Sequence, residues 1–335
     1  MSEAGGRTGS MGDVTEVRGP YEVAPFGNAL KELAASRTDI VGVTADMGRY
    51  SDFGPFKEAF PDRFFNVGMA EQSAVMVGAG LAKARKTAFV ATYSAFLTRR
   101  ALDFLTIACA HSRANVKVMG GSPGLVNPYG GTHQAIEDLA VTSRIPDLCV
   151  IDPCDATELR QVVAAAAETR GSFYIRNLRG KVPVVLDPAS YRFEIGAATV
   201  LREGTDVGVV STGYMTSRAL EAADRAVDAG VSVGVLHVPT IKPFDTSSVV
   251  AFCEEVPRVV TAENHLRSGG LGSLVIETLY DHGRRRPPVL RVGLADMFHD
   301  CGSQAFLDAR YGLDVDGIAQ AVVHGTWPPG PGQPG

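Results

Sequence analysis

Short apolar runs alternate with helical patterns along this chain, and that alternation limits the possible folds more than any other feature. Five runs before residue 180 have the β-branched and aromatic composition of buried strands: Ile40–Thr44, Thr87–Thr92, Val116–Met119, Leu148–Asp152 and Phe173–Arg176. Segments with apolar residues at helical spacing lie before and between them: Tyr21–Ser36, Tyr93–Cys109, Gln134–Arg144 and Ala156–Thr169. Such alternation predicts an α/β fold, with a parallel sheet covered by helices on both faces.

A break in this pattern falls at Gly180–Tyr191, where the run KVPVVLDPAS is typical of a linker. Beyond it, four further strand candidates alternate with helices: Asp206–Ser211, Val231–Val238, Arg258–Glu263 and Val289–Leu294. We therefore predict two α/β domains, at 21–180 and 196–327, joined by a linker at 181–195, with the second domain the smaller. The polar start (1–20) is predicted to be a flexible arm, and the Pro- and Gly-rich end (328–335) a disordered tail.

The composition excludes several classes of protein. The chain has 32 Lys and Arg against 37 Asp and Glu, so it lacks the basic footprint of a nucleic-acid or anionic-membrane binder. No apolar run approaches the roughly 20 residues that a membrane-spanning helix needs, and the first residues do not resemble a signal peptide, so we expect a cytoplasmic protein. Five scattered cysteines without a CxxC pair favour reduced thiols over a zinc site or a disulfide framework.

The segment RFFNVGMAEQSAVMVGAGL (Arg63–Leu81) places one acid, Glu71, between a short strand and a helix. The strand candidate Arg63–Val67 is aromatic and β-branched, and the helix carries no charge from Ser73 to Ala82, so it is expected to be largely buried. A carboxylate at this position has a simple structural use, because it complements the positive end of the helix dipole. The other interpretation is a buried acid with a chemical role.

A long irregular segment, GGSPGLVNPYGGTHQ (120–134), follows the strand that ends at Met119. Its glycines and prolines exclude regular structure, and loops of this length inside a compact domain usually have a function. His133 stands near its end, and a histidine with a pKa near neutrality can transfer protons. A structural histidine is the alternative.

Four motifs, in this order and at these separations, resemble the pyrimidine-binding domain of transketolases: FPDRFFNVGMAEQ, YSAFLTRRALDFL, GGTHQAIEDLA and YIRNLRG. Two runs in the second domain resemble the C-terminal domain of the same superfamily: ENHLRSGGLGSLV and DMFHDCGSQAFLDARYGLDVDGIAQAV. The resemblance extends from about Tyr21 to Gly325. It implies two three-layer α/β domains, a parallel-sheet pyrimidine-binding domain followed by a smaller, mixed-sheet C-terminal domain.

Full-length transketolases also carry a diphosphate-binding domain, whose GDG motif and a later Asn hold magnesium and the diphosphate. No GDG occurs in this sequence. The chain therefore resembles the C-terminal half of a split transketolase, and a separately encoded partner is expected to supply the missing domain. The resemblance implies thiamine diphosphate between the two proteins, Mg²⁺ held mainly by the partner with no metal ligand in this chain, and an α2β2 heterotetramer.

The resemblance assigns Glu71 to the cofactor. In this family a carboxyl group that is hydrogen-bonded to the pyrimidine nitrogen N1′ favours the imino tautomer, which then takes a proton from the thiazolium carbon. Burial in an apolar site suits such an acid. Phe96 aligns with the aromatic residue that stacks on the pyrimidine, a contact worth on the order of 1 kcal/mol beyond area burial. Tyr93 and Arg99 in YSAFLTRR are further candidates for contact with the cofactor; a core Tyr and a solvated helix Arg are the alternatives.

His133 matches the family histidine that reaches the reacting carbonyl or hydroxyl of the sugar, so it is a catalytic and substrate-binding candidate. Four positions earlier, Tyr129 replaces an acid that contacts a sugar hydroxyl in the family. Gly121 and Ser122 stand where relatives carry a basic residue for the acceptor phosphate. Arg176 matches a second phosphate-binding arginine, so one anion contact is expected to remain. These differences predict a substrate other than an ordinary aldose phosphate.

Three more residues align with family positions. Asp46 and Thr44, in VTADMG, align with a segment that lines the substrate channel, although core or loop roles fit equally. His265 in ENHLRSGGLG has a counterpart near the domain interface.

The favoured hypothesis is a transketolase-type transferase that moves a two-carbon ketol unit from a ketose donor to an aldehyde acceptor. A decarboxylating relative is the second enzyme hypothesis, either similar to deoxyxylulose-phosphate synthase, whose YSxFLxR pattern YSAFLTRR resembles, or to a 2-oxoacid dehydrogenase beta subunit. A noncatalytic binding or scaffold subunit is the third. The substrate is then a small sugar or 2-oxo acid, with no nucleic acid and no membrane involved.

Overall fold

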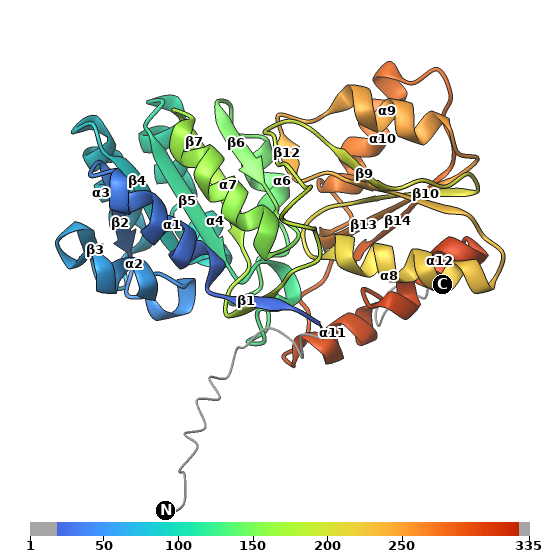
Figure 1. The fold of residues 1–335 in the computed structure, drawn as a ribbon, viewed down its shortest axis with the longest axis horizontal. Helices are drawn as coiled ribbons and strands as arrows, with labels where there is room; N and C mark the ends of the chain where they lie inside the picture. The colour runs from blue at the N-terminus through green and yellow to red at the C-terminus, as the bar shows by residue number, and fades with distance from the viewer. Residues whose placement is uncertain (1–18, 328–335) are drawn as a thin grey trace, which may run out of the picture.

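The computed structural model of the chain describes residues 19–327, and its first domain is built on a seven-stranded sheet (Figure 1). The strand order is β12-β6-β7-β5-β4-β2-β3. Six of these strands run parallel and come from the first domain: β2 (Ile40–Thr44), β3 (Phe64–Asn66), β4 (Thr87–Tyr93), β5 (Val116–Gly121), β6 (Leu148–Ile151) and β7 (Ser172–Asn177). The seventh, β12 (Thr240–Lys242), is antiparallel and comes from the second domain.

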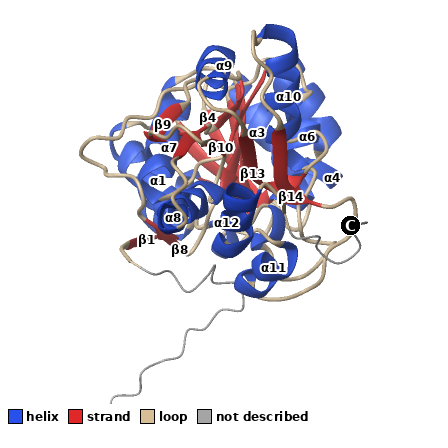
Figure 2. Cartoon of the chain, turned by 90° about the vertical axis from the view of Figure 1, so that its right-hand side faces the viewer, coloured by secondary structure: helices blue, strands red, loops and turns tan. Residues whose placement is uncertain are grey.

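Helices cover both faces of this sheet (Figure 2). The α-helices of the first domain are α1 (Pro25–Ser36), α2 (Gly54–Ala59), α3 (Glu71–Lys83), α4 (Ser94–Arg100), α5 (Leu102–Phe104), α6 (Asp138–Ser143) and α7 (Ala156–Glu168). Short 3₁₀ turns occur at Arg49–Ser51, Pro61–Arg63 and Gly124–Val126, and a π-helical stretch at Leu105–His111. Helix α3 packs closely on β4, because a Cβ atom on Gly78 would lie 2.5 Å from Cγ2 of Val90.

The second domain has a five-stranded mixed sheet in the order β14-β13-β10-β11-β9. Its strands are β9 (Thr199–Arg202), which is antiparallel, and the parallel strands β10 (Val207–Ser211), β11 (Val233–His237), β13 (Val259–Leu266) and β14 (Val289–Leu294). Its helices are α8 (Met215–Asp228), α9 (Thr246–Glu254), α10 (Leu271–His282), α11 (Gln304–Tyr311) and α12 (Val315–His324). The predicted fold class, a parallel-sheet domain followed by a smaller mixed-sheet domain, is confirmed.

The expected helix Tyr21–Ser36 is too long. Residues Tyr21–Val23 form a strand, β1, that pairs antiparallel with β8 (Lys181–Pro183), and the helix begins at Pro25. A proline is favoured at a first helical position because its fixed φ suits the helix and its missing N–H is not needed there. The predicted linker therefore begins with a paired strand.

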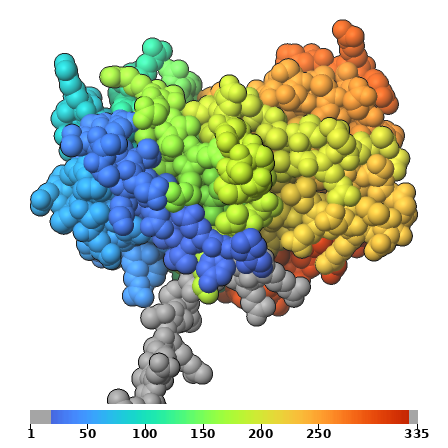
Figure 3. All heavy atoms as spheres, viewed as in Figure 1, coloured from blue at the N-terminus to red at the C-terminus, as the bar shows by residue number. Residues whose placement is uncertain are grey.

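The two domains lie against each other along a long boundary (Figure 3). After β8 the chain stays bound to the first domain, because the Asp155 carboxylate accepts hydrogen bonds from the backbone N–H groups of Val185 and Leu186, at 2.7 and 2.8 Å. Within residues 19–327, no helix has both the length and the apolar character needed to cross a bilayer. The predicted arm, apart from its last two residues, and the predicted tail lie outside the described residues.

Candidate active site

The sheet topology brings the predicted site residues to one edge of the first domain. Strands β2, β4 and β5 run parallel, so their carboxyl ends meet at the same edge, and the helices and loops that follow them start there. In open α/β sheets this edge is where ligands bind. Two non-glycine residues there have a left-handed backbone, Asp46 (φ 59°) and Ser122 (φ 51°), a strain that often marks functional loops.

Glu71 is the first residue of α3, and its side chain is only 5% exposed. One basic side chain reaches it, since Nη1 of Arg100 donates a hydrogen bond to Oε1 of Glu71 at 2.9 Å. Arg100 ends α4, and its guanidinium carbon lies 3.9 Å from the centroid of the Phe96 ring. The surroundings of Glu71 are therefore not purely apolar, in contrast to the expected apolar site, because they include a guanidinium group. Sequence spacing does not reveal Arg100, because 29 residues separate the pair.

Aromatic rings gather beside this pair. The ring centroids of Phe96 and His133 are 5.2 Å apart, those of Tyr93 and Phe96 5.6 Å, and those of Tyr129 and His133 5.4 Å, with tilted or edge-to-face geometry. Tyr93 and Phe96 are buried, whereas Tyr129 is exposed. We call Glu71, Phe96, Arg100 and His133, with the two tyrosines, the carboxyl-end cluster. It offers a carboxyl group, a stacking surface and a histidine within one connected set of contacts.

His133 is held by a tight loop whose anchor is Arg99. Arg99 donates to the backbone oxygens of Gly131 and Gln134 at 2.6 and 2.8 Å, and its Nε and Nη2 bind the Glu137 carboxylate at 2.5 and 2.9 Å. These hydrogen bonds use its guanidinium, so Arg99 acts on the cluster through the loop. Partial burial and the nearby Arg100 charge lower the pKa of His133 below its ordinary value, which favours the neutral imidazole.

The second domain supports the same loop from the other side. Nε2 of Gln134 donates to the backbone oxygen of Asp300 at 3.0 Å, and the N–H of Gly302 donates to the oxygen of Pro128 at 3.1 Å. Gly130, with φ 77°, leaves space for Cys301, because a Cβ atom there would lie 2.6 Å from its Sγ. The position of the His133 loop therefore depends on both domains.

A second unpredicted arginine lies at this edge. Nε of Arg179 donates to Oγ of Ser122 at 3.0 Å, and its guanidinium carbon lies 5.9 Å from the Tyr50 ring. Burial raises the pKa of the neighbouring Tyr93 hydroxyl, and the Arg179 charge opposes that rise. Arg179 thus brings a cation to Ser122, the position at which the sequence lacks the expected basic residue. A side chain far along the chain supplies the charge, so local alignment misses it.

Two family models match the chain. The transketolase pyrimidine binding domain matches residues 23–184, and the transketolase C-terminal domain matches residues 196–318. This chain belongs to the transketolase family. It corresponds to the C-terminal half of a split transketolase.

Individual members of the transketolase family agree with this placement. A transketolase family protein of Sinorhizobium fredii is 45% identical over 304 residues, which cover 90% of this chain and 88% of that protein. The 6-deoxy-6-sulfo-D-fructose transketolase subunit of a Clostridium species is 37% identical over 299 residues, which cover 89% and 92%. Among solved structures, a split gene transketolase described as an inactive β4 tetramer has a TM-score of 0.80 and 37% identity, and covers 90% of this chain and 97% of that one.

The carboxyl-end cluster of this transketolase-family chain suits the pyrimidine half of thiamine diphosphate. A heterocycle needs a stacking surface, which Phe96 offers, and a hydrogen-bonding group, which the buried carboxyl of Glu71 offers. The one group of metal-ligand type within residues 19–327 is Cys154, Glu158 and His237, which lies outside the cluster. There, Glu158 already accepts hydrogen bonds from Tyr191 and His237.

Two predicted substrate residues lie in the core of the transketolase fold. Arg176 is 1% exposed, and its guanidinium binds Asp138 at 2.5 Å and Asp152 at 3.1 Å. These contacts argue against a substrate phosphate on Arg176, because two buried carboxylates already balance its charge. His265 is also fully buried: Nδ1 donates to the oxygen of Leu266 at 2.7 Å, and Nε2 accepts from the N–H of Ala140 at 3.2 Å. It joins the two domains.

Asp46 lies at the rim of the carboxyl-end edge and is exposed. It exchanges two hydrogen bonds of 2.9 Å with Asn66, which follows from the pairing of β2 with β3. Thr44 is buried and donates to the oxygen of Ala91 at 3.0 Å. Asp46 therefore remains a candidate for the channel, whereas Thr44 serves the sheet.

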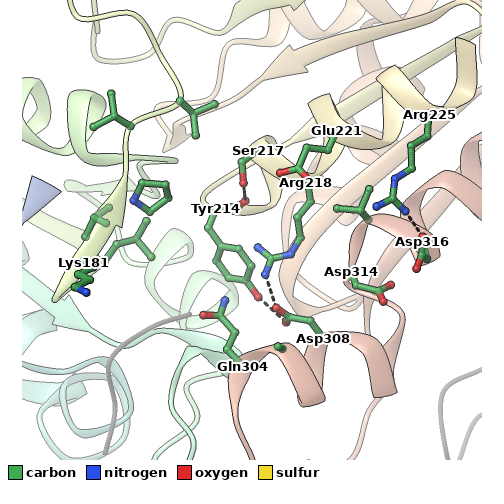
Figure 4. Close-up of a pocket in the computed structure, with 17 residues that line it drawn as sticks. Lys181, Tyr214, Ser217, Arg218, Glu221, Arg225, Gln304, Asp308, Asp314 and Asp316 are labelled. Atoms are coloured by element: carbon green, nitrogen blue, oxygen red, sulfur yellow. Dashed lines mark hydrogen bonds and ion pairs between the residues drawn. The ribbon is translucent and has the colours of Figure 1, made fainter. Parts of the chain in front are cut away.

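A separate cavity of about 450 Å³ lies between β8, α8 and the C-terminal helices (Figure 4). Its deep wall is made by Tyr214 and Arg218, which both bind the buried carboxylate of Asp308. None of the predicted site residues lines this cavity. The cavity is therefore distinct from the carboxyl-end cluster.

Proposed function

We propose that this chain is the pyrimidine-binding subunit of a thiamine diphosphate-dependent, transketolase-like transferase. It would move a two-carbon ketol unit from a ketose donor to an aldehyde acceptor. The observation that carries the proposal is the buried carboxyl of Glu71 at the start of α3, connected through Arg100 to the aromatic surface of Phe96. A transketolase family member needs these two groups at this edge, and a scaffold subunit has no need of them.

Glu71 would bind the ring nitrogen N1′ of the pyrimidine, and Phe96 would stack on the ring. When bound, thiamine diphosphate supplies the nucleophilic carbon that carries the two-carbon unit. Glu71 would present its carboxyl to N1′ in a water-poor site, because its side chain is 95% removed from solvent at the start of a largely apolar helix. Tyr93 would pack behind the ring, since it is buried against Phe96.

His133 would give a proton to the oxygen of the substrate carbonyl and take it back from the hydroxyl. Its lowered pKa keeps the imidazole neutral at physiological pH, so it can accept a proton as well as donate one. Tyr129, which is exposed beside it, would contact the sugar. Asp46 would line the approach to the cluster.

Arg179, in place of the predicted Arg176, is our candidate for the residue that binds an anionic group on the substrate. It lies beside Ser122 at the carboxyl end of β5, and a guanidinium suits a phosphate or a sulfonate. The name of the Clostridium relative specifies a sulfonated sugar, which supports an anionic substrate. An exposed Tyr129 in place of an acid would also avoid repelling such a substrate.

A separately encoded partner would hold the diphosphate and Mg²⁺. The absence of a GDG motif and the 97% coverage of a split gene transketolase chain support this division of labour. The assembly would be a cytoplasmic α2β2 heterotetramer. The inactive β4 tetramer reported for that relative suggests that this chain alone is inactive too.

A decarboxylating reaction is the second candidate, favoured by one observation. YSAFLTRR is the local pattern of deoxyxylulose-phosphate synthase, and its Arg99 has a defined task here, because it anchors the His133 loop. Donor choice separates the two functions. A ketose donor supports the transketolase reaction, whereas release of carbon dioxide from a 2-oxo acid supports the second candidate.

The deciding experiment mixes the purified chain with its diphosphate-binding partner, thiamine diphosphate and Mg²⁺, and measures ketol transfer. We expect negligible activity from the chain alone and at least about a 100-fold gain in the mixture. Glu71→Ala should lower the activity of the mixture by about the same factor while the thermal unfolding temperature stays near that of the wild type. Full activity of the chain alone, or of the Glu71→Ala mixture, would contradict the proposal.

A further inference from the structure

Arg100 occupies the two groups that the proposed function assigns to the pyrimidine ring. Its Nη1 donates to Oε1 of Glu71 at 2.9 Å, and its guanidinium carbon lies 3.9 Å from the centroid of the Phe96 ring. A guanidinium is planar and delocalised, and it stacks on an aromatic face much as a heterocycle does. Arg100 and a bound pyrimidine would therefore compete for the same carboxyl group and the same ring.

Arg100 also has freedom that its neighbour lacks. Its side chain is 51% exposed, and within residues 19–327 its guanidinium donates a hydrogen bond to Glu71 alone. Arg99 is 30% exposed and is fixed by hydrogen bonds to Glu137 and to two backbone oxygens. Arg100 can therefore turn toward solvent when its ion pair with Glu71 and its stacking on Phe96 break, whereas Arg99 must stay to hold the His133 loop.

We propose that Arg100 is a placeholder for the pyrimidine ring, which has to displace Arg100 to reach Glu71 and Phe96; this inference rests on the proposed function. A ligand that bonds to Glu71 replaces the partner that Arg100 provided. A ligand that only stacks on Phe96 leaves a buried carboxyl unpaired, which is costly. Glu71 itself thus favours rings with a hydrogen-bonding nitrogen at the position of N1′, and Arg100 lowers the apparent affinity of every ring that takes its place.

The size of the effect follows from the fraction of molecules in which Arg100 has moved away. The apparent dissociation constant equals the intrinsic one divided by that fraction. An ion pair in which one partner is half exposed holds the closed form by a modest margin, so removing Arg100 should tighten binding by about three- to tenfold. A ring without N1′ should gain by the same factor, because it also has to displace Arg100 from Phe96, so the ratio of the two affinities should not change.

The test is a calorimetric titration of the complex with its diphosphate-binding partner in the presence of Mg²⁺. The two probes are thiamine diphosphate and its analogue with carbon in place of N1′. Arg100→Ala should bind both probes about three- to tenfold more tightly than the wild type, with the ratio of the two affinities unchanged. The matched control is Arg144→Ala, because Arg144 is similarly exposed (58%) and also pairs with a glutamate, Glu277. It should bind both probes as the wild type does.

Two further measurements keep the outcomes apart. Arg100→Gln, which keeps a hydrogen-bond donor but not the charge, should bind thiamine diphosphate with intermediate affinity, and circular dichroism checks that each variant folds. If Arg100→Ala binds thiamine diphosphate no more tightly than the wild type, the placeholder role of Arg100 is refuted, whereas the proposed function stands. If the wild-type complex binds no thiamine diphosphate, the proposed function itself fails.

Discussion

Nη2 of Arg176 lies 2.5 Å from Oδ1 of Asp138, and both side chains are almost completely buried. Tyr174 donates to the same aspartate at 2.6 Å, and Nη2 of Arg176 also reaches the backbone oxygen of Asn264 in the second domain at 3.2 Å. The pair therefore ties the core of the first domain to the second.

Removing this arginine should destabilise the protein strongly. Arg176→Ala leaves two buried carboxylates without their cation, so we expect a loss of about 3–5 kcal/mol in the free energy of unfolding. Urea denaturation followed by circular dichroism measures it. Arg113→Ala, which breaks the exposed pair with Asp147, should cost less than about 1 kcal/mol. Equal losses of unfolding free energy in the two variants would show that the buried ion pair stabilises the protein no more than the exposed one.

Arg179 and Arg176 are three positions apart and should differ in function. In the complex, Arg179→Ala should raise the KM for a phosphorylated or sulfonated aldehyde by about 10- to 100-fold, the usual value of a hydrogen bond to a charged group. The KM for a neutral aldehyde should change little, because the lost contact is electrostatic. Steady-state kinetics with paired acceptors measures both values. A similar rise for both acceptors would mean that Arg179 has a structural role.

Arg99 should affect catalysis through the loop. Arg99→Ala removes the hydrogen bonds to Gly131 and Gln134, so His133 would lose its fixed position and kcat/KM should fall by about 10- to 100-fold. Hydrogen exchange of residues 124–134 should become faster in this variant, whereas exchange in α3 should not change. Slower turnover without faster exchange in the loop would instead favour direct contact with the cofactor.

His299 makes stability depend on pH. It is 4% exposed, its ring lies 4.5 Å from that of Tyr311, and neither ring nitrogen has a hydrogen-bond partner within residues 19–327. Burial lowers its pKa to about 4, against 6.5 for the unperturbed group, so the unfolded chain binds the proton more readily. Its contribution is therefore fully present above about pH 6.5 and is lost as the pH falls toward 4.

Urea midpoints between pH 7 and pH 4.5 test this dependence. His299→Phe keeps an aromatic ring against Tyr311 and removes the titrating group, so its stability should fall less steeply with acid than that of the wild type. His111→Gln, at an exposed histidine, should follow the wild-type curve. Parallel curves for wild type and His299→Phe would exclude His299 as the source.

The main strands could be predicted because their signal is local. Ile40–Thr44 and Val289–Leu294 are largely apolar runs that pair parallel with their neighbours, and both have the predicted bounds. The three-residue strands β1, β8 and β12 were not predicted. Strands of this length carry no periodic pattern, and their partners lie far away in the sequence, as with Tyr21 opposite Pro183.

The same difference between local and long-range signals applies to the residues of the candidate site. Glu71, Phe96 and His133 stand in motifs with fixed spacing, and the structure brings them into one connected set of contacts, although their roles stay predictions. Helical spacing does place Arg100 beside Phe96, four positions earlier in α4. The contacts of Arg100 with Glu71 and of Arg179 with Ser122 span 29 and 57 residues, which spacing does not encode. Long-range contacts also explain why sequence spacing does not reveal the buried ion pairs of Arg176, since its partners Asp138 and Asp152 follow other strands.

The exchanged strand β12 has a mechanical consequence. Thr240 and Lys242 of the second domain pair with Ile151 and Val150, so a segment of one domain completes the edge of the sheet in the other. Hinge bending between the domains would have to rupture backbone hydrogen bonds in a sheet. Any opening of the site therefore has to come from side chains and loops. A gene cut near residue 195 would separate β12 from the sheet that it completes in the first domain.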